Sequence, residues 1–224
     1  MRGLLAKIFA IFWKDLLSEF RTKELITSVL VFALLVVVIF NFAFDPDTGV
    51  IELVASGILW IALTFAGVLG LNRTFVSEKA DARLEGLMLC PVDRAAIYWG
   101  KLISSCVFML IVAFIITPIF LVLLNLPLIL PRLPIIIVLA TLGFASVGTL
   151  FSALAINTRS RDVMLPILFL PTVVPVIIAA VKATELVLQS EPWGEILIWI
   201  QIIIAFDVIY LVVATMVFEY VIQE

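Results

Sequence analysis

The side chains that could do chemistry gather in one polar stretch, residues 72–101, of an otherwise strongly apolar chain. Five charges of both signs fall within eight residues there: Glu78, Lys79, Asp81, Arg83 and Glu85. Such a mixture disfavours burial in lipid and suits either solvent or a polar socket on another protein. Recognition is therefore the chemistry that we expect of this stretch.

Composition excludes several kinds of catalytic and binding site. The chain contains no histidine, which rules out histidine proton switches, His-ligated metal sites and His-ligated haem within it. Cys90 and Cys106 are too far apart for a metal or redox motif. The nucleotide-binding pattern GxxxxGK(S/T) is absent, because the fragment Gly100-Lys101-Leu102 lacks the preceding glycine and the hydroxyl residue. We predict no catalytic residue, metal site or bound cofactor in this chain. Its net charge of −3 also gives no sign of the basic surface that binds nucleic acid.

The elements that position the polar stretch are predicted to be membrane-spanning helices. Hydrophobic residues make up 64% of the 224 and charged residues 14%, whereas globular domains are about 25% charged. A helix needs about 20 apolar residues to cross a bilayer. Six windows qualify, at residues 25–44, 53–71, 102–124, 133–156, 163–181 and 196–218. We predict an all-α integral membrane protein with one domain over residues 1–224, because runs this long do not fit barrel strands.

The basic residues predict how the six spans are oriented. The N-terminal segment, the polar stretch and the loop after the fourth window together carry all lysines and arginines except Arg132 and Lys182. Because basic residues concentrate in cytoplasmic loops, both termini and the polar stretch are expected in the cytoplasm.

Residues 4–22 are predicted to form an amphipathic helix in the cytoplasmic membrane surface. Its apolar stripe recurs at spacings of three or four: Leu5, Phe9, Phe12, Leu16 and Phe20. Charged residues lie mostly off that stripe, and Trp13 is a residue type that anchors at the lipid interface. A solvated N-terminal helix is the alternative. A signal peptide is not expected, because Lys7 and Lys14 interrupt the apolar run and no small-residue cleavage site follows.

Two features inside the windows invite a functional interpretation. Asp207 is the one carboxylate well inside a window, and a charged aspartate at mid-bilayer costs about 2.5–3.5 kcal/mol, so it should face protein or water. Either a hydrogen-bonded packing role or a proton-relay or substrate role fits it. Pro166, Pro171 and Pro175 each remove a backbone donor from the fifth window and predict a bend or break. The bend could be a static kink or a gate.

The polar stretch resembles a pattern of ABC-2-type exporter permeases, E…GxLExLxxxP…K. This chain matches it with Glu78, the run LEGLML at residues 84–89, Pro91 and Lys101. Ala82 stands where the pattern has glycine, and alanine still permits a helix.

Further motifs resemble the haem exporter protein B family, the permease subunit of the cytochrome c maturation ABC complex. They are Leu142-Gly143-Phe144, the run LPILFLP at residues 165–171, and Pro175. Together with the polar stretch, the resemblance covers nearly the whole chain.

The resemblance implies a coupling helix that presses into a groove of an ATPase and is followed by a turn at Pro91. Its residues are Glu78, Arg83, Leu84, Glu85, Leu87 and Met88. The implied partners, in a bacterial inner membrane, are an ATPase holding ATP and Mg²⁺ (CcmA), a haem-handling membrane protein (CcmC), a small helper (CcmD) and a haem chaperone (CcmE). A second copy of this chain is a further candidate. Haem is the implied cargo; either it is exported or ATP hydrolysis releases the haem-loaded chaperone, and the missing histidines favour release.

Other functions fit the residues as well. The polar stretch could be an ordinary solvated helix between two spans. An ABC-2 permease for a lipid, drug or polysaccharide would share the same layout, and a non-transporting membrane scaffold would use the stretch only to recruit partners. A secondary transporter would need ion ligands inside the membrane, for which Asp207 is the one candidate.

Overall fold

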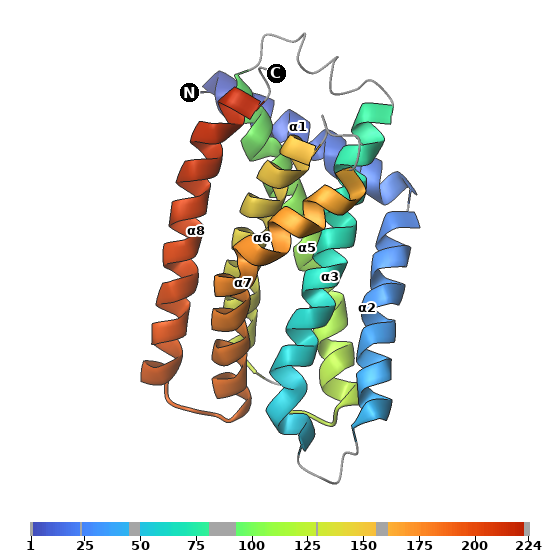
Figure 1. The fold of residues 1–224 in the computed structure, drawn as a ribbon, viewed down its shortest axis with the longest axis vertical. Coiled ribbons are helices and arrows are strands. Elements are labelled where there is room, and N and C mark those ends of the chain that lie inside the picture. Colours follow the sequence, from blue (N-terminus) through green and yellow to red (C-terminus); the bar gives the residue numbers. More distant parts are fainter. Residues whose placement is uncertain are drawn as a thin grey trace.

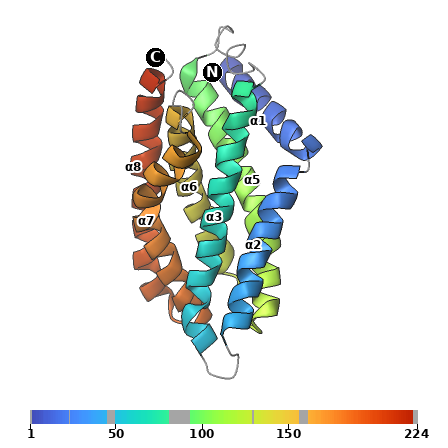
Figure 2. The same cartoon turned by 45° about the vertical axis from the view of Figure 1, so that its right-hand side comes forward.

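The computed structural model describes residues 2–22, 24–44, 50–80, 93–128, 130–155 and 161–221. All regular secondary structure within these ranges is helical: α1 (Arg2–Thr22), α2 (Glu24–Ala43), α3 (Val50–Ala80), α5 (Arg94–Leu123), α6 (Leu133–Ala155), α7 (Arg161–Leu188) and α8 (Trp193–Val221). The helices α2, α3, α5, α6, α7 and α8 form one bundle, and α1 lies across one end of it (Figures 1 and 2). The start of α1 and the end of α8 lie at that same end (Figure 1).

Six helices in the described part of the chain are long and apolar enough to cross a membrane. Their candidate spans are Ile26–Ala43, Val54–Leu71, Arg94–Leu123, Leu133–Ala155, Met164–Leu188 and Trp193–Phe218. The predicted all-α membrane class is thereby confirmed, and each predicted window corresponds to one of these helices. The predicted N-terminal helix is present as α1.

Two helices are longer than the apolar windows that predicted them. Helix α5 begins at Arg94 rather than at residue 102, and α7 continues past residue 181 to Leu188. An apolar window ends at the first charged residue, whereas the backbone hydrogen bonds of a helix continue through charged residues. Lys182 and Glu185 therefore lie in the last turns of α7 rather than in a loop, and their side chains form an ion pair at 2.8 Å.

At the end of the bundle opposite α1, helices α5 and α7 each end in a tight turn. Asn125 and Ser190 both adopt positive φ, at 55° and 60°, directly after α5 and α7. In each case, the following amide bonds back to a carbonyl in the last helical turn, which satisfies groups that a helix end leaves free. Arg132 then joins the two loops, because it donates a 2.7 Å hydrogen bond to the Glu191 carbonyl and stacks over Trp193.

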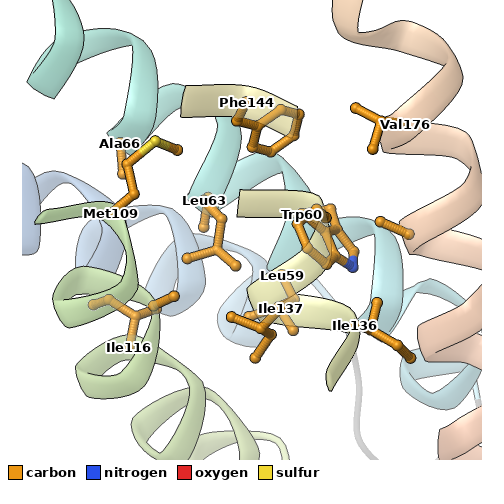
Figure 3. Close-up of a cluster of buried hydrophobic side chains, with 14 of the residues drawn as sticks. Leu59, Trp60, Leu63, Ala66, Met109, Ile116, Ile136, Ile137, Phe144 and Val176 are labelled. Carbon is orange, nitrogen blue, oxygen red and sulfur yellow. The ribbon is translucent and has the colours of Figure 1, made fainter. Parts of the chain in front are cut away.

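The core is a continuous apolar cluster to which all six bundle helices contribute, and Figure 3 shows the part of it between α3, α5, α6 and α7. Trp60 lies at its centre, with its ring edge-on to Phe144 at a centroid distance of 6.0 Å. The Trp60 indole also donates a 2.9 Å hydrogen bond to Thr184, which ties α3 to α7. Because the indole nitrogen is satisfied, this large side chain can be fully buried without a polar penalty.

Candidate functional site

Of the predicted coupling residues, only Glu78 falls within the described part of the chain. The backbone of Glu78 belongs to α3, which continues as unbroken helix from its span to Ala80. Arg83, Leu84, Glu85, Leu87, Met88 and Pro91 lie outside the described residues. The nine helical residues after the span, at 1.5 Å each, carry the chain about 13 Å beyond it.

The chain re-enters the described bundle at α5. Asp93 occupies the N-cap position, with extended backbone angles, and the amides of Ala96 and Ile97 bond to its carbonyl. The Asp93 side chain makes no capping hydrogen bond, so α5 begins without a side-chain cap. Helices α3 and α5 thus contain the two ends of the polar stretch.

The first turns of α5 carry an ion pair that the sequence did not predict. We had expected Lys101 on the cytoplasmic loop, but it is 1% exposed. Its Nζ lies 3.6 Å from Oδ2 of Asp15 in α1, which is itself 5% exposed. The other carboxylate oxygen of Asp15 lies 3.0 Å from Nζ of the partly exposed Lys14. A buried charge requires such a partner, which explains why α1 carries an acid on the face turned to the bundle.

The backbones of α1 and α5 also approach closely beside this pair. A Cβ added at Gly100 would lie 2.8 Å from the Ile11 side chain, so only glycine fits. One turn later, the Ser104 hydroxyl lies 3.4 Å from the Phe12 carbonyl and 3.0 Å from that of Gly100. Charge, shape and hydrogen bonding therefore all fix α1 against the same short segment of α5.

Tyr98 connects the same segment to the rest of the bundle. Its hydroxyl lies 3.1 Å from that of Ser146 in α6, and its ring packs 5.2 Å from that of Phe218 in α8. The base of α5 is thus held by α1 on one side and by α6 and α8 on the other.

The outer face of α1 is apolar and exposed. Phe9 is 61% exposed and Trp13 52%, and Leu5 and Leu17 share that face, whereas Ile11 is buried. The predicted stripe is split between two environments, since Phe12 and Leu16 are partly buried and Leu5 and Phe9 are not. The side chain of Phe20 lies outside the described ones.

Asp207 is buried in α8 at 3% exposure. Its carboxyl lies against Gly143 of α6, where an added Cβ would collide with it. Neither carboxyl oxygen has a hydrogen-bond partner among the described residues. Gln201, another polar residue in the span of α8, is exposed and lies on another face of the helix.

The three prolines lie within one continuous helix. Figure 1 shows α7 crossing α3 obliquely in its first half and then turning to run along the bundle. Pro171 and Pro175 are exposed, and Pro166 is partly buried. Near the bend, the Thr172 hydroxyl donates a 2.7 Å hydrogen bond to the Leu168 carbonyl one turn earlier, a contact that threonine commonly makes within helices. A role as a gate stays a prediction.

Residues 6–223 match the family model described as CcmB protein. The chain belongs to the CcmB family. Heme exporter protein B of Pseudomonas aeruginosa is 27% identical over 81% of this chain and 82% of its own length. The protein of the same name from Rhodobacter capsulatus is 31% identical over 66% and 69%, and that from Haemophilus influenzae 28% over 81% and 82%.

Membership of the CcmB family confirms the resemblance drawn from the motifs and, with the six spans, a multi-pass membrane protein. The ion pair between α1 and α5 escaped sequence reasoning. A usable signal existed, because Asp15 interrupts an apolar helix face and Lys101 directly precedes an apolar window. Charges in such places need partners, but the sequence does not say which acid meets which base.

Proposed function

We propose that this chain is the transmembrane permease subunit of an ABC transporter complex in cytochrome c biogenesis. The observation that carries the proposal is the CcmB family match over residues 6–223, whose relatives bear the name Heme exporter protein B. The six candidate spans and the lack of a nucleotide-binding loop in the sequence support a membrane subunit that responds to ATP hydrolysis by a partner and does not hydrolyse ATP itself.

The polar stretch is the segment that we propose transmits the conformational change of the ATPase to this subunit. Its coupling residues, Glu78, Arg83, Leu84, Glu85, Leu87 and Met88, dock on the ATPase CcmA, and Pro91 ends the helix. The two helices that contain the ends of the stretch support this role, because α3 projects beyond its span and α5 begins before its apolar run. CcmC, CcmD and CcmE complete the proposed complex in the bacterial inner membrane, and both termini of this chain are cytoplasmic.

The output of the complex is haem export or release of the haem-loaded chaperone. Release fits this chain better, because a sequence without histidine offers no histidine ligand for haem iron. Haem is then cargo of the complex, and ATP and Mg²⁺ belong to the ATPase.

Reversing one charge in the polar stretch tests the proposal. In the co-purified complex, Glu85→Lys should weaken binding of the ATPase by at least about tenfold and lower stimulated ATP hydrolysis with it, because a wrong charge at an interface costs several kcal/mol. Glu195→Lys is the matched control, because Glu195 is exposed at the opposite end of the bundle. Unchanged ATPase binding and hydrolysis in Glu85→Lys would refute the coupling role.

A further inference from the structure

We propose that Asp207 is a proton-binding site whose proton holds α8 on α6. The carboxyl is neutral in the arrangement described above, and α8 moves away from α6 when the proton is lost. This property belongs to the chain itself and does not depend on the ATPase or on the proposed function.

The Asp207 side chain lies deep in the bundle. It is 3% exposed and stands near the middle of the 26-residue candidate span of α8. Neither of its carboxyl oxygens has a hydrogen-bond partner in the described part of the chain. An ionised carboxylate in such a place has no donor to stabilise its charge. A bound proton removes the charge, so the buried group is the neutral acid.

The groups that face Asp207 supply no positive charge. Helix α6 contributes Gly143 and contains no titratable residue. From α5, the Cys106 thiol is within electrostatic range of the carboxyl, and a thiol is never a cation. Along α8 itself, the nearest titratable side chain in the sequence is Tyr210, which cannot become a cation either.

The described lysines of the neighbouring helices contact other acids. Lys101 of α5 lies 3.6 Å from Asp15 of α1. Lys182 of α7 lies 2.8 Å from Glu185 in the last turns of its own helix. A proton is therefore the cation that Asp207 can bind without a basic side chain.

The contact between α8 and α6 leaves little room beside the carboxyl. A Cβ added at Gly143 would collide with one carboxyl oxygen of Asp207 and would lie 3.2 Å from the Phe206 ring. Because not even a methyl group fits on this side, a proton is the ligand that the contact admits there. Hydration of an ionised carboxylate at that oxygen would require α8 to move off α6.

The adjoining part of the contact is apolar and can open. Ala214 and Phe218 of α8 cluster with Leu150 of α6 and with Ile11 of α1. In a membrane, apolar side chains gain little by leaving lipid for one another, so such contacts resist separation only weakly. When the proton leaves, the O–H bond breaks, its electron pair stays on the carboxylate and the proton passes to water. Uptake of a proton reverses this step and lets α8 return.

Infrared spectroscopy of the full chain, in a detergent free of ester groups, tests for the proton. An aspartate in water is ionised above about pH 4, so the carbonyl band of a protonated carboxylic acid at neutral pH marks a buried neutral acid. The wild type should show this band and Asp207→Asn should lose it. Glu195→Gln is the matched control and should keep the band, because Glu195 is an exposed carboxyl in the first turn of the same helix.

Spin labels in liposomes test whether the proton holds the contact. Val138 of α6 and Ile202 of α8 are exposed and stand at corresponding positions before Gly143 and Asp207, so labels there report the separation of the two helices. The two native cysteines are replaced by alanine. As the pH rises through the range in which the acid band disappears, the distance should lengthen by at least about 1–2 Å, the size of helix shifts in switching transitions. In Asp207→Asn, which has no proton to lose at this position, the distance should stay constant.

Absence of the acid band from the wild type at neutral pH would overturn the inference. Loss of the band without a change in distance would overturn it as well, and so would the same change in Asp207→Asn. Asp207→Leu, which is similar in size and cannot ionise, replaces Asp207→Asn if that variant does not accumulate. Neither measurement involves the ATPase, so the outcome for Glu85→Lys decides the proposed function separately.

Discussion

At the scale of single residues, glycines mark the places where two helices of the bundle come closest. An added Cβ at Gly143 would meet the Asp207 carboxyl and would lie 3.2 Å from the Phe206 ring, whereas at Gly57 nothing lies within 4 Å. Both glycines sit within helices that cross the membrane. The same substitution should therefore have opposite effects at the two positions.

We predict that Gly143→Ala destabilises the fold by about 1–3 kcal/mol, because α6 and α8 must move apart to admit the methyl group. Gly57→Ala is the control and should be neutral or stabilising by up to about 1 kcal/mol, since alanine favours helix and meets no obstacle. Unfolding of both variants in detergent, followed by circular dichroism, measures the difference. Equal stability of the two variants would contradict the close packing of α8 on α6.

At the scale of elements, periodicity predicted α1 but not its orientation. Leu5, Phe9 and Phe12 belong to one stripe in the sequence, and a stripe can face either lipid or protein. The structure turns Ile11 and Asp15 toward α5 and leaves Phe9 and Trp13 outside. Contacts with α5, which is distant in the sequence, determine this orientation, and a local sequence pattern carries no information about them.

We predict that spin labels at Leu5, Phe9, Trp13 and Leu17 in liposomes report lipid contact through high oxygen accessibility. Labels at Ile8 and Ile11 should report low accessibility to both oxygen and water-soluble reagents, because these positions face α5. The expected repeat is about 3.6 residues. Uniform water accessibility along α1 would show that it is a solvated helix and not an interfacial one.

At the scale of the whole molecule, hydropathy and charge predicted most of the architecture. The membrane class, the number of long apolar helices in the described chain and the existence of α1 all follow from burying apolar surface in lipid. Helix ends were less predictable, because α7 continues as helix through Lys182 and Glu185, beyond the end of its apolar window. The candidate site was predictable only in part. Motifs indicated the polar stretch, but pairing Asp15 with Lys101 depends on how distant helices pack.

The orientation of the bundle gives a prediction at this scale. Because basic residues concentrate at the end that carries α1, that end should be cytoplasmic. Green fluorescent protein fused after the last residue should fluoresce, and alkaline phosphatase at the same position should be inactive. Phosphatase inserted after Leu128, in the loop between α5 and α6, should be active. The reverse pattern would mean that the bundle is inverted.

The docking of α1 on α5 also sets the order in which the molecule can be built. Phe12 and Ser104, which meet at this junction, are 92 residues apart in the chain. At about 5–20 residues per second, the ribosome needs roughly 5–18 s to make the segment between them. For that time, Ile11 and Phe12 exist without the segment of α5 against which they pack. Helix α1 is therefore made well before the helix that gives it most of its final contacts.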